Sequence, residues 1–259
     1  MDRTGYLLRT YDLPVPRYTS YPTANHFSEA VGAKDYRAWL GTLAPGCSLS
    51  LYLHIPYCRE LCHYCGCNTK ATQKYRPVAD YLTALEAEIA AVSGLVPASH
   101  AVTHIHWGGG SPNILEASDI LQLGDSLATQ FTLSRDAEFA VEIDARQLHP
   151  DQVAAFAKVG VNRVSLGVQD FNETVQRAIG RMQSYETTRQ AVEYFRDQGI
   201  RSINIDLVYG LPHQTEDSVA RTIEQVLCLD PDRIAIFGYA HLPQRLKHQR
   251  LIDTATLPG

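Results

Sequence analysis

The chain has 259 residues, of which 45% are hydrophobic and 20% are charged, and its formal net charge at pH 7 is −5. This composition is typical of globular proteins and excludes a disordered, collagen-like or coiled-coil chain. The acidic balance argues against a nucleic-acid-binding protein that needs a strong basic field. No apolar run approaches the roughly 18 residues of a membrane span, and the first residues include Asp2 without an apolar signal segment. We therefore expect a cytoplasmic protein with neither membrane nor nucleic-acid partners.

The cysteines are the most informative part of the composition. Four of the six lie within ten residues of one another: Cys58, Cys62, Cys65 and Cys67. In a reducing compartment such clustering indicates metal or redox chemistry rather than disulfide bonds. Cys47 and Cys228 lie apart from the cluster, and we interpret both as structural thiols without a role in function.

Short runs rich in Ile, Val and Leu alternate with helical patterns, as is typical of parallel strands that are buried on both faces. The predicted strands cover residues 49–55, 103–107, 138–143, 163–168, 202–208 and 233–237. The predicted helices cover residues 80–92, a segment capped by Ser118, residues 187–198 ended by Gly199, and residues 217–229 ended by Asp230 and Pro231. This alternation predicts a parallel α/β fold.

Either a doubly wound open sheet or a (β/α) barrel fits this alternation, and the polar residues favour the barrel. They follow the carboxyl end of every predicted strand, where the active site of a barrel is built, whereas an open sheet would gather them at one switch point. They include His54, Gly108–Ser111, Glu142 and Asp144, Gln169 and Asp170, Asp206, and Tyr239–His241. Because only six strands are predicted where a full barrel has eight, we expect a partial (β/α)6 barrel over residues 48–259. Residues 1–47 are predicted to form an irregular N-terminal arm.

The spacing Cys58-x3-Cys62-x2-Cys65 brings three thiols into one loop. Structural zinc sites more often use two cysteine pairs separated by a dozen or more residues, and the sequence has no second pair. An iron–sulfur cluster fits better, because closely spaced loop cysteines can each reach a different iron and leave one iron open for a ligand. Cys67 could supply a fourth ligand, although we expect it to point elsewhere.

At these residues the sequence resembles a known family. The three cysteines, with Tyr64 before the last one, are similar to the signature of the radical S-adenosylmethionine (SAM) superfamily. The surrounding motifs narrow the resemblance to the oxygen-independent coproporphyrinogen III oxidases, or coproporphyrinogen dehydrogenases, of haem biosynthesis. These motifs are Tyr52–Cys58, Cys65–Asn68, His106–Pro112, Gly167–Phe171, Asn204–Pro212, Tyr239–Pro243 and, in the arm, Pro16–Ala24. One departure is Ala145, which stands where the family commonly has proline.

The resemblance implies a [4Fe–4S] cluster held by Cys58, Cys62 and Cys65, together with two bound SAM molecules. By motif match, the residues that would line the cluster-bound SAM are Tyr52, Gly109 and Glu142. Those that would line the second SAM are Tyr64, Gly110, Ser111, Gln169, Arg181, Asp206 and Ala240.

The chemistry of these residue types agrees with such roles, although each also has a structural interpretation. Glycines allow a ligand to approach the backbone, but a glycine triplet also makes an ordinary turn between strand and helix. Glu142 and Asp206 suit an ammonium or a ribose hydroxyl, or would form salt bridges inside the barrel. Arg181 could pair with a carboxylate through two hydrogen bonds, whereas a lone helix arginine is more often exposed.

The implied reaction is the oxidative decarboxylation of two propionate side chains of coproporphyrinogen III to vinyl groups, which gives protoporphyrinogen IX. A 5′-deoxyadenosyl radical derived from SAM would take a hydrogen atom from the β-carbon of each propionate, and carbon dioxide and one electron would leave. The barrel supplies position and excludes water, while the cofactor carries the difficult step. The resemblance further implies a monomer that takes electrons from a reducing donor such as flavodoxin or ferredoxin.

Two alternatives remain beside this function. A paralogue such as a haem chaperone or a haem-degrading radical SAM methyltransferase would share the barrel, but chaperone-type relatives typically lack the Cys65–Cys67 continuation and the arm motif. A non-enzymatic zinc-binding module is disfavoured by the six-strand pattern. The family also continues into further strands and a C-terminal domain that helps to cover the substrate, so we expect this chain to lack the C-terminal part of the family fold.

Overall fold

The computed structural model describes residues 3–11, 23 and 26–258. The chain divides into two compact units, Met1–Leu43 and Ala44–Gly259. In the first unit, the helices described are α1 (Arg3–Tyr11) and α2 (Ala33–Gly41). The arm motif at residues 16–24 lies, apart from Thr23, outside the described residues, and the predicted extent of the arm stays a prediction.

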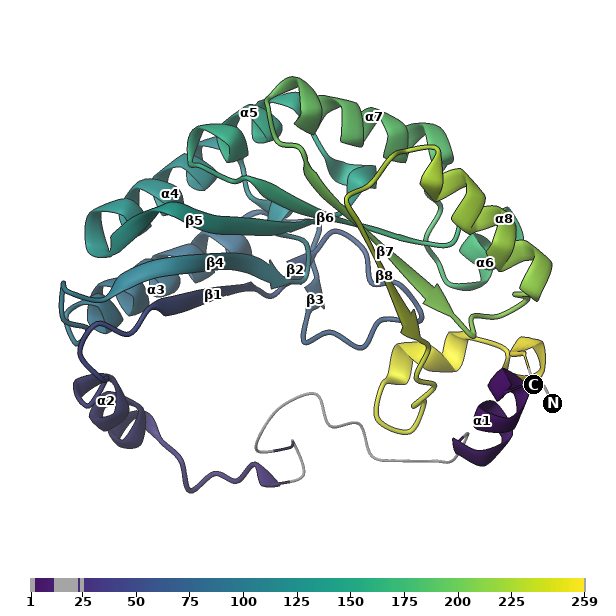
Figure 1. Cartoon of the computed structure of the whole chain (residues 1–259), viewed down its shortest axis with the longest axis horizontal. Coiled ribbons are helices and arrows are strands. Elements are labelled where there is room, and N and C mark those ends of the chain that lie inside the picture. Colours follow the sequence, from purple (N-terminus) through teal and green to yellow (C-terminus); the bar gives the residue numbers. More distant parts are fainter. Residues whose placement is uncertain (1–2, 12–22, 24–25, 259) are drawn as a thin grey trace. The chain divides into compact units, whose positions relative to one another are not determined.

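The second unit is built on a sheet of six parallel strands whose order in space follows their order in the chain. They are β1 (Leu49–Ile55), β4 (Ala101–Gly109), β5 (Thr132–Ile143), β6 (Arg163–Gln169), β7 (Ser202–Tyr209) and β8 (Arg233–Gly238). In a doubly wound sheet the strand order reverses at a switch point. Here it never reverses, so the prediction of a partial (β/α)6 barrel is confirmed (Figure 1).

Figure 1 shows the helices of this unit following the sheet along its outer face. They are α3 (Arg76–Ser93), α4 (Ala117–Gln130), α5 (Pro150–Lys158), α7 (Tyr185–Asp197) and α8 (Glu216–Leu227). The short helix α6 (Glu173–Ala178) packs through Val175 in a separate, smaller hydrophobic cluster. Among the described residues, no helix is both long enough and apolar enough to cross a membrane.

Some of the helix predictions were wrong in detail. Ser118 does not cap its helix, because Glu116 already has the extended backbone of an N-cap and Ser118 lies inside the first turn of α4. Helices α5 and α6 were not predicted. Helix α5 buries Val153 and Phe156, but its nine residues are too few for a clear periodic pattern. Gly199 was predicted correctly, since it follows the C-cap of α7 with a φ of 83°.

The hydrophobic core lies between the sheet and these helices. Side chains that alternate along the strands point into it, and Trp107 on β4 is fully buried against the rings of Phe139 on β5 and Phe156 on α5. The ring centroids lie 5.3 Å and 6.2 Å from that of Trp107, both in edge-on geometry. Because strand side chains alternate between faces, the opposite face of the sheet carries the intervening residues, which include Tyr52, His106 and Glu142.

Helices α4 and α5 approach each other closely at one glycine. A Cβ atom built on Gly124, in the interior of α4, would lie 2.5 Å from Cβ of Val159, the residue that caps α5. Contact at that distance requires the helices to move apart. The glycine therefore sets the distance between the two helices, at the cost of about 1 kcal/mol in helix propensity relative to alanine.

We predict that Gly124→Ala destabilises the protein by about 1 kcal/mol, because overpacking costs roughly 1–3 kcal/mol and outweighs the gain in helix propensity. In a Val159→Gly background the Val159 side-chain atoms that this Cβ would meet are absent, and the same Gly124→Ala substitution should stabilise the protein. Urea unfolding of the four proteins in this double-mutant cycle measures both effects. A destabilisation that is equal in the two backgrounds would contradict the packing explanation.

Candidate functional site

The cysteine segment follows β1 directly and is tied to the carboxyl edge of the sheet. Two short strands, β2 (Tyr57–Cys58) and β3 (Lys70–Ala71), pair in parallel and close the segment into a loop. The backbone N–H of Ser111, which follows β4, donates to the carbonyl of Tyr57 at 2.8 Å. The cysteine loop is thereby held against the end of the neighbouring strand.

A second anchor joins the middle of the loop to the end of α6. The backbone N–H of His63 donates to the carbonyl of Ile179 at 2.8 Å, and its Nδ1 lies 3.1 Å from the carbonyl oxygen of Ala178. Gly180 has a φ of 65°, and a Cβ there would lie 2.8 Å from Nε2 of His63. Only glycine suits both the backbone and the space at this position.

A third anchor comes from the segment after β8, within the 3-10 helix at Lys247–Leu251. The fully buried Gln249 donates from Nε2 to the carbonyl oxygens of Tyr64 at 3.0 Å and Ala240 at 3.2 Å. Its neighbour His248 places Nε2 2.6 Å from the carbonyl oxygen of Cys65. The loop is thus fixed to parts of the chain that lie far away in the sequence.

Each of the three predicted cysteine ligands has its own surroundings. Cys58 lies 3.3 Å from Oγ1 of Thr69 and accepts from Oγ of Ser111 at 3.5 Å. Burial raises the pKa of its thiol, and these two hydrogen bonds act in the opposite direction. The sulfur of Cys65 accepts from the backbone N–H of Cys67 at 3.4 Å, and the side chain of Cys67 is exposed.

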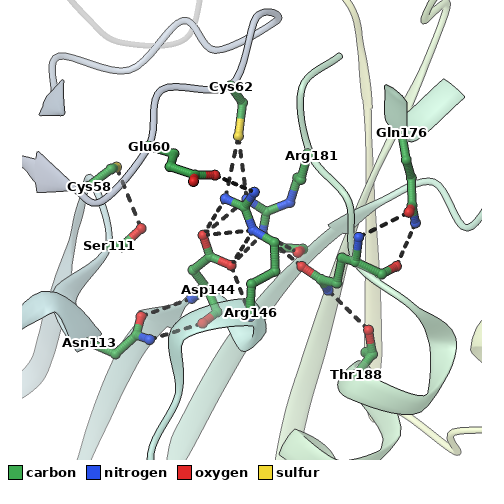
Figure 2. A network of polar contacts seen from close by, with 12 residues as sticks. Cys58, Glu60, Cys62, Ser111, Asn113, Asp144, Arg146, Gln176, Arg181 and Thr188 are labelled. Atoms are coloured by element: carbon green, nitrogen blue, oxygen red, sulfur yellow. Dashed lines mark hydrogen bonds and ion pairs between the residues drawn. The ribbon is translucent and has the colours of Figure 1, made fainter. Parts of the chain in front are cut away.

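The buried Cys62 sulfur faces two arginines (Figure 2). Arg146 donates to it at 3.7 Å and Arg181 at 3.6 Å. Both guanidinium groups also contact the carboxylate of Asp144, Arg146 at 2.7 Å and Arg181 at 3.3 Å. One carboxylate therefore pairs with two cations beneath the cysteine.

The backbone of Asp144 is held in place by the side chain of Asn113. The amide of Asn113 donates to the Asp144 carbonyl and accepts from the Asp144 N–H, both at 2.9 Å. Burial alone would raise the pKa of Asp144, but Arg181 and Arg146 outweigh it and hold that pKa below its ordinary value. Asp144 is therefore ionised at neutral pH.

A second group of side chains lies on the face of the sheet opposite the helices. His106 on β4 stacks on Tyr52 of β1 with 5.7 Å between the ring centroids, and its Nε2 lies 3.1 Å from Oε1 of Glu142 on β5. The other oxygen of Glu142 accepts from the backbone N–H of Gly109 at 3.1 Å. The structure thus brings Tyr52, Gly109 and Glu142 together, and His106 joins them.

The glycine triplet after β4 is required by the packing of the protein itself. A Cβ on Gly108 would meet the Glu142 carboxylate at 2.8 Å, and one on Gly109, whose φ is 110°, would meet the ring of His54 at 2.5 Å. A Cβ on Gly110 would lie 2.5 Å from the carbonyl oxygen of Tyr57. These contacts explain all three glycines before any ligand is considered.

Asp206 lies on β7 within a small polar network. Its carboxylate accepts from Oγ of Ser165 on β6 and from Nδ2 of Asn204, both at 2.7 Å. Burial is the main influence on the pKa of Asp206 and raises it, and the nearby charge of Glu142 adds to this effect. The salt bridges considered for Glu142 and Asp206 are absent from the described residues, apart from the Glu142–His106 pair.

The remaining predicted residues lie at the ends of β6 and β8, in the loop after α6 and in the cysteine loop. Gln169 ends β6 with a φ of 71°, and a Cβ on Gly167 would lie 2.9 Å from its Nε2 and 3.2 Å from Arg181. Arg181 is not an exposed helix arginine, because it lies in the loop after α6 and is buried. Tyr64 packs against Val208 and its neighbours in a satellite hydrophobic cluster, and burial raises its pKa.

Sequence reasoning missed three residues of this site: Arg146, His106 as a partner of Glu142, and Gln249. Each acts through a contact with a residue distant in the chain, so no local pattern pointed to it. Within the part of the chain that the structure describes, no three His, Cys, Asp or Glu side chains gather as a site for a single metal ion.

Comparison with known proteins identifies the second unit. A model of the radical SAM superfamily matches residues 52–226. The chain is 49% identical over 244 residues to an oxygen-independent coproporphyrinogen III oxidase of Bradyrhizobium diazoefficiens, and 43% identical over 251 residues to that of Paracoccus denitrificans. The structure of the coproporphyrinogen III oxidase of Escherichia coli superposes with a TM-score of 0.91 at 42% identity.

The matches differ in how much of each protein they cover. They include 94% and 97% of this chain but 54% and 56% of the two relatives, and 98% of this chain but 57% of the Escherichia coli structure. The chain therefore spans about half the length of the relatives that it matches.

We predict that Asp144→Asn lowers the free energy of unfolding of the metal-free chain at pH 7 by about 3–5 kcal/mol, because it leaves two buried guanidinium groups without their carboxylate. The folded-state pKa of Asp144 is depressed, so its contribution is fully present above the unfolded value near 3.8 and is lost as the pH falls through the folded value. The difference in free energy of unfolding between the variant and the wild type should therefore become smaller below about pH 4. Urea unfolding at pH 7 and pH 3 tests this, and a gap independent of pH would contradict it.

Proposed function

Since the chain belongs to the radical SAM superfamily, we propose that Cys58, Cys62 and Cys65 hold a [4Fe–4S] cluster and that SAM binds beside it at the carboxyl ends of the strands. The observation that carries this proposal is the surroundings of Cys62, a buried sulfur between two guanidinium groups that share one carboxylate. A pocket with excess positive charge suits an anionic cluster ligated by thiolates. The donor set and its electrostatics thus fit the cluster.

When bound together, the cluster and SAM supply the one-electron chemistry that removes a hydrogen atom from a substrate. The chain contributes binding and orientation. Glu142 has one carboxylate oxygen on Gly109 N–H and the other on His106, so its plane is fixed, and it is suited to accept from the ammonium group of SAM. Tyr52, stacked on His106, would line the same molecule.

A second SAM would lie beside residues of the cysteine loop and the later strands. These are Tyr64, Gly110, Ser111, Gln169, Arg181, Asp206 and Ala240. Three observations support a polar ligand there. Asp206 is held by Ser165 and Asn204, the backbone of Gln169 is strained, and Nε of Arg181 is buried without a partner among the described residues. The count of two SAM molecules belongs to this proposal.

The substrate we propose is coproporphyrinogen III, two propionate side chains of which would lose carbon dioxide and become vinyl groups. The support is the name carried by the relatives that are 43% and 49% identical to this chain. Because the chain spans about half of those relatives, turnover by the chain itself is part of the proposal. So are a flavodoxin or ferredoxin as reductant, a cytoplasmic location and a monomeric state. No observation favours the paralogue considered above.

The first test is anaerobic reconstitution with iron and sulfide, followed by metal analysis and electron paramagnetic resonance (EPR) of the reduced protein. We expect about four iron atoms per chain and a signal that changes when SAM is added. Cys62→Ala should abolish the signal, whereas Cys228→Ala, a change at an exposed cysteine that caps α8, should leave it intact. Retained zinc, or a cluster signal that SAM does not alter, would overturn the proposal.

A second test addresses the role of Glu142. Glu142→Gln keeps an acceptor for Gly109 N–H but removes the charge that an ammonium group would pair with. We expect the Kd of SAM for the reconstituted protein to rise about tenfold, equivalent to about 1.4 kcal/mol. The control is Glu138→Gln on the same strand, where the carboxylate pairs with Arg163 at 3.0 Å. Equal affinities in the two variants would remove Glu142 from the SAM site.

A further inference from the structure

The pocket beneath Cys62 holds more positive than negative charge. Arg146 and Arg181 have side chains that are 10% and 7% exposed, and among the described residues Asp144, at 8%, is the one carboxylate buried with them. Glu60 reaches Arg146 at 3.8 Å, but its side chain is 63% exposed and remains hydrated. One buried guanidinium charge is therefore left to be balanced from within the pocket, since an uncompensated buried charge is strongly unfavourable.

The group that can balance this charge is the sulfur of Cys62, at 3.7 Å and 3.6 Å from the two guanidinium groups. The orientation of Arg146 is fixed before it reaches the sulfur. Its Nε donates to Asp144 Oδ1 at 2.9 Å, its backbone N–H donates to the same oxygen at 3.1 Å, and its terminal nitrogen donates to Oδ2 at 2.7 Å. Figure 2 shows the guanidinium clamped on the carboxylate and directed at the cysteine.

Arg146 and Arg181 differ in what else they touch. Arg181 also donates to the carbonyl of Gly167 at 2.6 Å and to Gln183 at 3.1 Å, so it links several elements and is assigned above to a SAM site. Among the described residues, the polar contacts of Arg146 are with Asp144, Glu60 and Cys62. A substitution at Arg146 therefore changes the surroundings of one cluster ligand and leaves the residues assigned to SAM in place.

We propose that Arg146 is a positioning residue that holds the Cys62 sulfur for the cluster and raises the reduction potential of the cluster. The inference rests on the proposed function, because it needs the cluster. On reduction, one electron from an external low-potential donor enters the cluster, no bond is made or broken, and negative charge on the ligating sulfurs increases. N–H donors and a fixed cation at a sulfur favour the more negative, reduced form.

The test is an EPR-monitored redox titration of the reconstituted protein with dithionite and mediators. Arg146→Gln should make the equilibrium constant for reduction about tenfold smaller, which for one electron is a downward shift of about 59 mV. Arg146→Lys keeps the positive charge but loses the planar guanidinium group that pairs with Asp144. Its reduction potential should therefore lie between those of the wild type and Arg146→Gln. The control is Arg163→Gln, which removes an arginine paired with Glu138 at the other end of the sheet and should keep the wild-type potential.

The outcomes separate this inference from the proposed function. A wild-type chain that assembles no SAM-responsive cluster overturns both. A wild-type cluster with an unchanged potential in Arg146→Gln overturns the inference alone. If Arg146→Gln folds, as judged by circular dichroism, but binds less iron than Arg163→Gln, the result supports the proposal that Arg146 holds the Cys62 sulfur in position for the cluster. If it fails to fold, Arg146→Lys decides the question, and a wild-type potential in that variant overturns the inference.

Discussion

The sharing of one carboxylate by two buried guanidinium groups is the constraint on which the site depends. Asp144 follows β5, Arg146 lies in the short 3-10 helix that Asp144 caps, and Arg181 reaches the same carboxylate from the loop after α6. Because a buried charge without a partner is strongly destabilising, these segments cannot move apart independently. Asn113 holds the backbone of Asp144 from the other side. The cysteine loop therefore rests on a base whose geometry is set by electrostatics rather than by the loop itself.

The order of the strands explains why so many polar residues reach one place. All six are parallel and adjacent in chain order, so their carboxyl ends form one continuous edge. Each strand presents one face to the helices and buries it, which leaves the alternate positions free to carry polar groups. Tyr52, His106 and Glu142 occupy such positions on three consecutive strands. The core and the site thus lie on opposite faces of one sheet, and the alternation of side chains along the strands determines which residues belong to each.

The buried face of the sheet could be predicted from the sequence more completely than the face that carries the site. The strands were predicted well where an apolar run is buried, as with residues 49–55, which form β1. The residues that contact the predicted site residues were not predicted, because they lie far from those residues in the sequence. Arg146 and Cys62 are separated by 84 positions, His106 and Glu142 by 36, and Gln249 and Tyr64 by 185. Nothing local marks such residues. Charge balance in a buried pocket identifies them only once the fold is known.

The two acids on the inner face of the sheet show how separate parts of the site are coupled. Glu142 accepts from Gly109 N–H and lies against His106, whereas Asp206 is held by Ser165 and Asn204 and has a pKa raised first by burial and further by Glu142. The charge of Glu142 on β5 therefore reaches Asp206, although the two residues belong to different strands. A cation bound at Glu142 would relieve this repulsion at Asp206.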